Sequence, residues 1–572
     1  LATIKLNYKN KPLYLSEVVM DTTAERQDIS RYTIPLSESK AKEWIDSLSM
    51  TDFGDTTKRV YHGLADLNRR SLSPVVRIRI GERLRPIFDL MLKNLNRHLS
   101  CRAFPLPERG QRIFDLNQSL LLEFSGLYQL AALDMITRDE VSKRALQITI
   151  YRVLDYLGLY LMSTYSVYVR TRESIWHDIH HMYLLASERG LDKARLSEGR
   201  EGASSIEERY IQLNVLPLFK PYSLRQEEIV RIARYVESIT HLIKVSNEPL
   251  HSDANQNFVH AAMLNNAEPA VIMPYRDLPH SPTVRVFNLA PVILDLDRQI
   301  QEISQEQSSG LILKNGLSRN LLKRMVFHLT IIRNRQFNRF PKQEKMAVVL
   351  GMQSILEVLY QAYHGSSSDQ KREEDILFDN MLYGEASLVT GSKRNVDETT
   401  NNMQIWDLIN SSVGGYGLRW THKESSAIRV GELIGLRAIS HDENTWVVGV
   451  VKWMEYINKQ GLFCGIELLS TKVQALKATA VVNREVTNKF PQQGLMLPSV
   501  DGLREDPVLI LPSYIFQSGD KLIIDLQGRE EQVVLSSLDE CLGAFAYFRY
   551  KILTEEDKKP PEDDFGSLWL DL

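Results

Sequence analysis

The spacing of hydrophobic residues divides the chain into a helical first part and a strand-rich second part. Through residues 37–250, apolar residues recur every three or four positions, as they do within 87–95. This period places them on one face of a helix. Several such segments joined by short breaks predict an all-α bundle or array. Further segments with the same spacing are 119–136, 144–169, 175–186 and 227–243.

The pattern changes where the segment 251–317 begins. This segment contains several prolines, short strand-like runs and one helical pattern, so we expect a mixed connector. After one more helical pattern, short runs rich in Val, Ile and Trp alternate with Gly and Asn. Such runs predict an antiparallel β-barrel over 318–474 and a further β-rich unit with an acidic tail over 475–572. Residues 1–36 show no clear period and are expected to be irregular.

Helical spacing returns once inside the predicted barrel. After Gly351, the apolar residues Ile355, Leu356 and Leu359 fall on one helical face, and a polar stretch follows. A structureless loop of this length inside a compact domain is uncommon. We therefore expect a helical insertion at about 352–400 between two strands of one barrel. The predicted fold class is a multidomain α+β protein.

Composition adds limits on the type of protein. The chain has 572 residues, of which 43% are hydrophobic and 25% charged, which excludes a disordered or collagen-like chain. The net charge of -3 gives no basic excess for binding a nucleic acid polymer. The most apolar stretch, 157–169, is too short to span a membrane. Three widely spaced cysteines without a CxxC pair fit a reducing compartment, so we expect a cytoplasmic protein without membrane insertion.

The first candidate for chemistry is a pair of arginines just before a predicted strand. Arg335 and Arg339 are four residues apart. A guanidinium group can donate two parallel hydrogen bonds to phosphate oxygens or to the O6/N7 edge of guanine. Arg79 and Arg83 have the same spacing inside a helical pattern, where two solvated arginines are the simpler interpretation. We expect the basic cluster of Arg77, Arg79, Arg83 and Arg85 to lie on an amphipathic, solvent-facing helix, so this spacing alone identifies no site.

The second candidate lies in the segment 407–418, where a strand-like start runs into a glycine-rich turn. Asn410 and Ser412 can hydrogen-bond a ligand or their own backbone. Three glycines, at positions 414, 415 and 417, would let the backbone adopt positive φ and approach a ligand closely. The alternative for this segment is a structural turn in a hairpin.

Together the two segments resemble the PilZ domain family, over about residues 333–469. The family signature is RxxxR before the first strand and [D/N]xSxxG after a later strand. Arg335 and Arg339 match its first element, and Asn410, Ser412 and Gly415 match its second.

The resemblance implies binding of cyclic di-GMP, often as an intercalated pair of molecules. The arginines Arg335 and Arg339 would hold phosphates and guanine edges, and Asn410 and Ser412 would contact base or phosphate. A nearby arginine, Arg333, is a further candidate. This chain departs from the family in that Arg339 and Asn410 are 71 positions apart, because of the insertion. The two halves of the site meet only if their strands are neighbours.

The predicted function is therefore that of a non-catalytic cyclic di-GMP receptor that needs no cofactor or metal. The helical domain would engage a protein partner or a second copy of the chain. The first alternative is a PilZ-like protein that no longer binds nucleotide and serves as a protein-interaction scaffold.

The second alternative is a metal-dependent hydrolase centred on His177 and His181. These residues are one helical turn apart, with Asp178 in the place of the zincin glutamate. No third ligand with suitable spacing follows, and Trp176 and His180 partly match the opening of a TPR repeat that has no second copy. Packing is the simpler interpretation of this helix. The sequence contains no P-loop, GxGxxG or GxSxG motif.

Overall fold

The structure is a computed structural model in which the chain forms two compact units. Unit 1 comprises Leu1–Asn334 with the short segments Lys423–Ser426 and Glu455–Gln460. Unit 2 comprises Arg335–His422, Ala427–Met454 and Gly461–Leu572. The structure describes residues 32–49, 51–99, 103–138, 142–197, 205–248, 257–305, 316–332, 338–364, 403–439, 445–482, 485–486, 491–499, 506–513, 515–526, 528–542 and 545–553.

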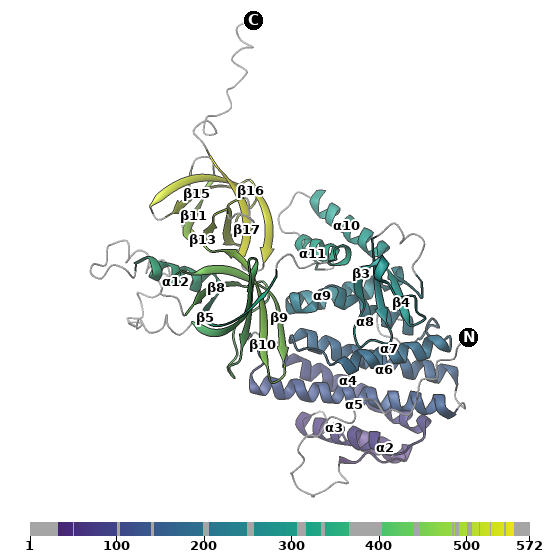
Figure 1. The fold of residues 1–572 in the computed structure, drawn as a ribbon. Helices are drawn as coiled ribbons and strands as arrows, with labels where there is room; N and C mark the ends of the chain where they lie inside the picture. Colours follow the sequence, from purple (N-terminus) through teal and green to yellow (C-terminus); the bar gives the residue numbers. More distant parts are fainter. Residues whose placement is uncertain are drawn as a thin grey trace. The chain divides into compact units, whose positions relative to one another are not determined.

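Unit 1 begins with a series of α-helices that share one hydrophobic core. The long helices α4, α5 and α6 lie side by side (Figure 1), and their buried faces contribute most of that core. The helices are α2 (Glu38–Asp46), α3 (Phe53–Arg69), α4 (Pro74–Arg97), α5 (Glu108–Arg138), α6 (Lys143–Ser166), α7 (Glu173–Glu188), α8 (Ile206–Leu218) and α9 (Gln226–Ile239).

One helix in the described part of the chain, α5, is long and apolar enough to cross a membrane by length and composition. However, 72% of its most apolar stretch is buried inside the protein. Phe124 and Tyr128 of α5 are fully buried, and Phe124 stacks on Phe88 of α4 with ring centroids 4.0 Å apart. The apolar character of α5 is therefore accounted for by its central place in the helical core.

One arginine of the basic cluster on α4, Arg77, is not exposed to solvent as expected. Arg77 is only 3% exposed, and its guanidinium donates to the carbonyl oxygens of Leu67 and Arg70 at 3.1 and 2.8 Å. Those carbonyls belong to the end of α3, where no further helical turn follows, and that of Leu67 also accepts from the backbone NH of Arg70. Arg77 thus caps α3, and the prediction that it faces solvent is wrong. The exposed residues Arg79 and Arg83 both pair with Glu38.

The remainder of unit 1 is a four-stranded antiparallel sheet with two helices. The strand order is β1-β4-β2-β3. Phe287 of the sheet, Val292 of α10 and Leu322 of α11 belong to the same buried core as α4–α9. The predicted connector segment and the helix after it therefore share the core of the helical region. The elements are β1 (Lys244–Ser246), β2 (Phe258–Met263), β3 (Val271–Pro274), β4 (Val284–Asn288), α10 (Ala290–Gln305) and α11 (Arg319–Thr330).

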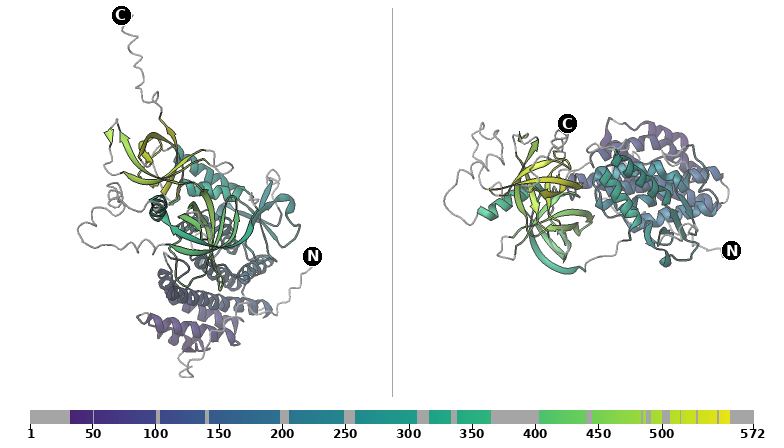
Figure 2. Two further views of the ribbon diagram at one scale, coloured as in Figure 1. Left: turned by 60° about the vertical axis from the view of Figure 1, so that its left-hand side comes forward. Right: turned by 90° about the horizontal axis from the view of Figure 1, so that it is seen from above.

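Unit 2 contains two β-barrels (Figures 1 and 2). The first is a closed antiparallel barrel with the strand order β10-β7-β6-β5-β8-β9. Trp406, Leu418 and Cys464 are fully buried on three of its strands. The strands are β5 (Phe340–Leu350), β6 (Gln404–Ser412), β7 (Gly415–Trp420), β8 (Leu433–Ala438), β9 (Val447–Ile457) and β10 (Gly461–Ser470).

The second barrel is formed by the C-terminal strands. Pairing of β11 with β15 closes the series β11-β13-β14-β17-β16-β15, and β12 adds to the outside of β11. The predicted α+β multidomain class, with a helical region followed by a barrel and a further β-rich unit, is confirmed. The strands are β11 (Gln474–Val482), β12 (Glu485–Val486), β13 (Gln492–Leu497), β14 (Val508–Pro512), β15 (Lys521–Leu526), β16 (Arg529–Leu542) and β17 (Phe545–Ile552).

The helix α12 (Gly351–His364) follows β5 directly and contacts both barrels through β5, β8 and β11. Gly351 has φ of 81°, a left-handed conformation that glycine adopts without strain and that turns the strand into the helix. Ile355 and Leu356 are buried with Leu433 of the first barrel and Ile510 of the second. The start of the inserted segment therefore packs as part of the core of unit 2.

We expect Ile355→Ala to lower the free energy of unfolding by about 3 kcal/mol, because it removes fully buried methyl groups and leaves a cavity. Gln361→Ala, at an exposed position on the same helix, is the matched control. Urea denaturation of the full chain measures both variants. Equal midpoints for the two would show that α12 does not support the barrels.

Candidate nucleotide site

The pairing of β5 with β6 brings the two motif segments together at one end of the first barrel. In this antiparallel pair, Phe340 is opposite Ser411 and Pro341 is opposite Asn410. Arg339 directly precedes Phe340 and is exposed. The end of the arginine motif therefore lies beside the asparagine motif, although the two are far apart in the sequence.

The structure places the other predicted site residues as follows. Ser412 ends β6 and Gly415 begins β7, and they face each other across a two-residue turn. Arg333 and Arg335 lie outside the described residues. Arg339, Asn410, Ser412 and Gly415 thus belong to one barrel end, and Arg339 pairs with none of the acidic groups that the structure describes.

Irregular pairing changes the direction of side chains at this barrel end. Two residues of β5 lie between Pro341 and Glu344, where β6 has only Ile409. On its other side, β6 has Ile409 as an extra residue relative to β7. Such bulges interrupt the alternation of side chains between the two faces of a sheet. They separate the regular, buried part of β6 from the motif residues that follow.

The glycines of the turn have a different role from the one expected. Gly415 has the expected positive φ, at 159°, whereas Gly414 and Gly417 do not, so the prediction of positive φ is wrong at those two positions. A Cβ atom at Gly417 would lie 2.6 Å from Oδ1 of Asn410, so this glycine makes room for the Asn410 side chain.

Gly415 is required by a close approach of two strands. A Cβ atom at this position would lie 2.0 Å from the carbonyl oxygen of Ile466 in β10. Real side chains do not come this close, and a backbone oxygen in a barrel strand cannot move aside without breaking the strand pairing. The hydroxyl of Ser412 also donates to the Gly415 carbonyl at 3.2 Å. These contacts hold the hairpin between β6 and β7 in one conformation.

Trp453, which the sequence did not identify as a candidate, lies next to a glycine that is paired with the motif hairpin. Gly417 of β7 is opposite Gly465 of β10. A Cβ atom at Gly465 would lie 1.8 Å from Nε1 of Trp453, so the indole ring lies over this glycine. Gly417 and Gly465 thus form a surface patch without side chains of its own, and the side chains of Asn410 and Trp453 cover it. Glycines recurring in paired strands are the signal that could have identified this surface.

Further along the same strands, the charged side chain of Asp407 pairs with those of Lys345 and Arg419. Asp407 accepts from Lys345 at 2.5 Å and from Arg419 at 3.3 Å. Burial alone would raise the pKa of Asp407, but hydrogen bonds and charges from the two cations lower it overall. Lys345 and Arg419 are therefore occupied by a carboxylate of the barrel. Arg339 remains available to an anionic ligand.

The histidine helix of the hydrolase alternative lies in α7 of unit 1. His180 is buried between the hydroxyl of Tyr210 and the carbonyl of Glu268, at 2.8 and 2.7 Å. Burial lowers its pKa to about 4. Burial also lowers the pKa of His181, with a further contribution from His177. No group of three possible metal ligands occurs within the described ranges of the chain.

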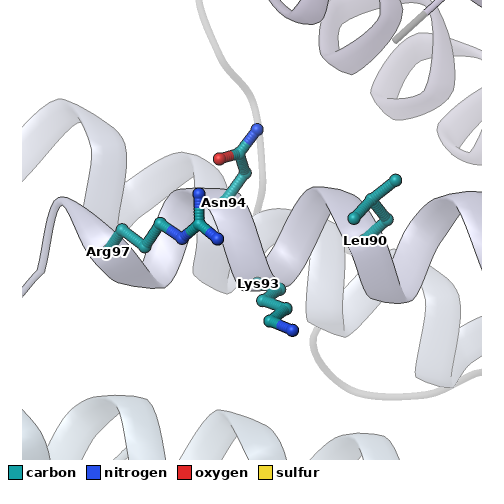
Figure 3. A pocket seen from close by; sticks show the side chains of 4 residues that line it. All are labelled: Leu90, Lys93, Asn94 and Arg97. Atoms are coloured by element: carbon teal, nitrogen blue, oxygen red, sulfur yellow. The ribbon is translucent and has the colours of Figure 1, made fainter.

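A separate hollow of about 240 Å³ lies on α4 in unit 1 (Figure 3). Its lining residues lie along one side of the helix and include two cations one turn apart. None of the predicted nucleotide-binding residues contributes to it. The lining residues are Leu90, Lys93, Asn94 and Arg97.

Comparison with known proteins gives consistent matches along the chain. Three family models match in order: "Cyclic-di-GMP receptor FimW, N-terminal domain" at residues 39–250, "Cyclic-di-GMP receptor FimW, middle PilZ domain" at 360–474 and "FimW C-terminal beta-barrel domain" at 478–553. The PilZ match begins after β5, so the arginine motif lies outside it.

A curated relative matches almost the whole chain. The Cyclic-di-GMP receptor FimW of Pseudomonas aeruginosa is 24% identical over 594 aligned positions, which cover 93% of this chain and 95% of the relative. No solved structure matches with significance. The helical first part, the closed barrel with its PilZ signature and the second barrel correspond to the three matched domains in the same order. The chain therefore contains a PilZ domain, between a helical domain and a C-terminal barrel domain that are similar to those of FimW.

Proposed function

We propose that this protein is a non-catalytic receptor for cyclic di-GMP, with its binding site at the barrel end where β5 begins and β6 turns into β7. The observation that carries the proposal is the register of Pro341 opposite Asn410. In this register Arg339, the last residue of the arginine motif, lies beside the asparagine motif. The relative that covers nearly the whole chain is named a receptor for the same nucleotide.

The chemistry of the barrel end suits this ligand. Cyclic di-GMP carries two phosphate charges and two guanine bases. Arg339, and Arg335 before it, can each supply a planar pair of donors to a phosphate or to a guanine edge. The amide of Asn410, which lies over Gly417, offers both a donor and an acceptor to a ligand.

The inserted helix does not favour the scaffold alternative. α12 packs against β8 and β11, and its buried Ile355 contacts the core between the two barrels. The nucleotide site that we propose lies on β6, β7 and the start of β5. The described part of the insertion therefore supports the barrel from other strands.

Isothermal titration of the full chain tests the proposal. We expect saturable binding of cyclic di-GMP with micromolar or tighter affinity, and much weaker binding of GMP, which carries only one base and one phosphate. Absence of heat with cyclic di-GMP, confirmed by equilibrium dialysis, would support the scaffold alternative instead.

We expect Asn410→Ala to weaken binding of cyclic di-GMP about 10-fold, because the ligand loses the hydrogen bonds of one side-chain amide. Asn410→Asp is the matched control, since the family signature accepts either residue, and it is expected to retain binding. Titration calorimetry measures both variants. An equal effect of both substitutions would argue that the side chain supports the hairpin rather than the ligand.

We also propose that the helical unit engages a protein partner, that the protein acts in the cytoplasm and that it uses no cofactor or metal. The α4 hollow, with Lys93 and Arg97 beside the half-exposed Leu90, would suit an acidic segment with one apolar side chain. A second copy of the chain is the alternative partner.

A further inference from the structure

An exposed phenylalanine stands at the start of the first barrel. Phe340 is the first residue of β5, and 67% of its surface is exposed. Single exposed apolar residues are common, but this one directly follows Arg339 and faces the motif hairpin. Val413, at the tip of that hairpin, is 65% exposed. The proposed nucleotide site thus has two strongly exposed apolar side chains at its edge.

Strand register places a second aromatic residue on the same face. Phe340 is opposite Ser411 in β6, and Ser411 is opposite Tyr416 in β7. Residues opposite each other in antiparallel strands project to the same face of the sheet. Two aromatic residues therefore flank one small polar residue at the barrel end.

The spacing of these two aromatic residues suits a planar base. Neighbouring strands lie about 4.8 Å apart, so Phe340 and Tyr416, two strands apart, have backbones separated by about 10 Å. A planar ring held between two others needs about 7 Å, which is twice a carbon contact distance of about 3.5 Å. The residue between them, Ser411, has a small side chain, and on its other side Tyr416 is opposite the buried Ile466 of β10.

We propose that Phe340 and Tyr416 form a base slot, in which one guanine of the bound dinucleotide stacks between the two rings and the Ser411 hydroxyl meets its edge. This inference rests on the proposed function and adds a specificity-determining site to it. Arg339 would hold a phosphate while the next residue along the chain holds a base. Arg339 directly precedes β5 and Phe340 begins it, so the two side chains project to opposite faces of the sheet at the barrel end and would contact the phosphate and the base from different sides.

Charges around Tyr416 support a fixed position for its ring. Lys342 and Glu344 form an ion pair at 2.7 Å, and both act on the charge state of the Tyr416 hydroxyl. Partial burial is the main cause that raises the pKa of Tyr416, so the phenol stays neutral near pH 7. A neutral ring held beside this pair can stack on a base without repelling the phosphate.

Four variants of the full chain test the slot by titration with cyclic di-GMP. We expect Phe340→Ala to weaken binding about 10-fold or more, and Phe340→Trp, which keeps a planar ring, to stay within about 3-fold of the wild type. Tyr416→Leu is expected to weaken binding in the same way as Phe340→Ala. Tyr275→Ala removes a 42%-exposed aromatic residue from unit 1 and is the matched control, expected to have no effect.

The possible outcomes distinguish failure of the proposed base slot from failure of the proposed receptor function. If the wild type binds and Phe340→Ala binds equally well, the slot is wrong and the receptor function stands. If Phe340→Trp fails as badly as Phe340→Ala, the role of stacking is overturned in favour of a tight steric fit. If the wild type does not bind, both proposals fail. Circular dichroism of each variant confirms that the barrel has folded.

Discussion

The double variant Arg335→Ala/Arg339→Ala is expected to bind cyclic di-GMP at least about 100-fold more weakly than the wild type. Each guanidinium can donate two charge-assisted hydrogen bonds, and a hydrogen bond to a charged group is worth about 1.5–3 kcal/mol. Loss of two such groups exceeds the effect of any neutral contact at the site. Isothermal titration measures the change directly.

The matched control for this variant is Arg529→Ala in the second barrel. Arg529 is also a strongly exposed arginine of unit 2, so its loss changes the net charge without touching the proposed site. The Arg529→Ala variant should bind cyclic di-GMP with the same affinity as the wild type. Unchanged affinity in the double variant would dismiss Arg335 and Arg339 as ligands.

Gly415→Ala should both destabilise the first barrel and abolish nucleotide binding. The added Cβ would lie 2.0 Å from the carbonyl oxygen of Ile466, so the pairing of β7 with β10 must shift. Overpacking of this kind costs about 1–3 kcal/mol, and a backbone neighbour places it at the upper end. The hairpin that carries Ser412 would move with the strand. Thermal unfolding and calorimetric titration of the variant measure the two effects.

Gly110→Ala, near the start of α5, is the control for replacing a glycine. Its nearest neighbours would be 3.6 Å from the new Cβ, an ordinary contact, and alanine is favoured in a helix. This variant should be as stable as the wild type or more stable. If Gly415→Ala were as stable as the wild type, the close approach of Gly415 to Ile466 would not be needed for the stability of the barrel.

The broad architecture was predictable because hydrophobic period depends on local sequence. The three- to four-residue period of α4–α9 and the Val-rich runs of β9 and β10 each reflect one buried face. The short apolar run 346–350 predicted only the buried end of β5, which begins six residues earlier at Phe340. The exposed half of that strand has no apolar alternation, so only its pairing with β6 identifies it.

Helix ends and buried charges were less predictable because they depend on distant partners. At the start of α9, the backbone NH of Arg225 donates to the side chain of Glu228 at 2.9 Å, so the helix begins at Gln226. Arg77 is buried by carbonyl groups at the end of another helix. A single sequence shows the charge of Arg77 but not the acceptors that the fold brings to it.

The motif residues of the site could be found from sequence, but their surroundings could not. Asn410, Ser412 and Gly415 stand at a recognisable spacing. Phe340 and Trp453 show no such spacing, because they reach the site by strand register and by contact with a glycine on a neighbouring strand. Strand pairing in the folded barrel places them there. Their contribution to binding stays a prediction until the variants are measured.

Amide hydrogen exchange of the full chain, with and without cyclic di-GMP, tests the central claim most directly. If the nucleotide binds at the proposed barrel end, exchange should slow in segments 335–341 and 409–417 and stay unchanged around the α4 hollow. The first segment covers the arginine motif and the second covers the hairpin. Protection confined to other parts of the chain, or no protection at a saturating concentration of nucleotide, would contradict the proposed site.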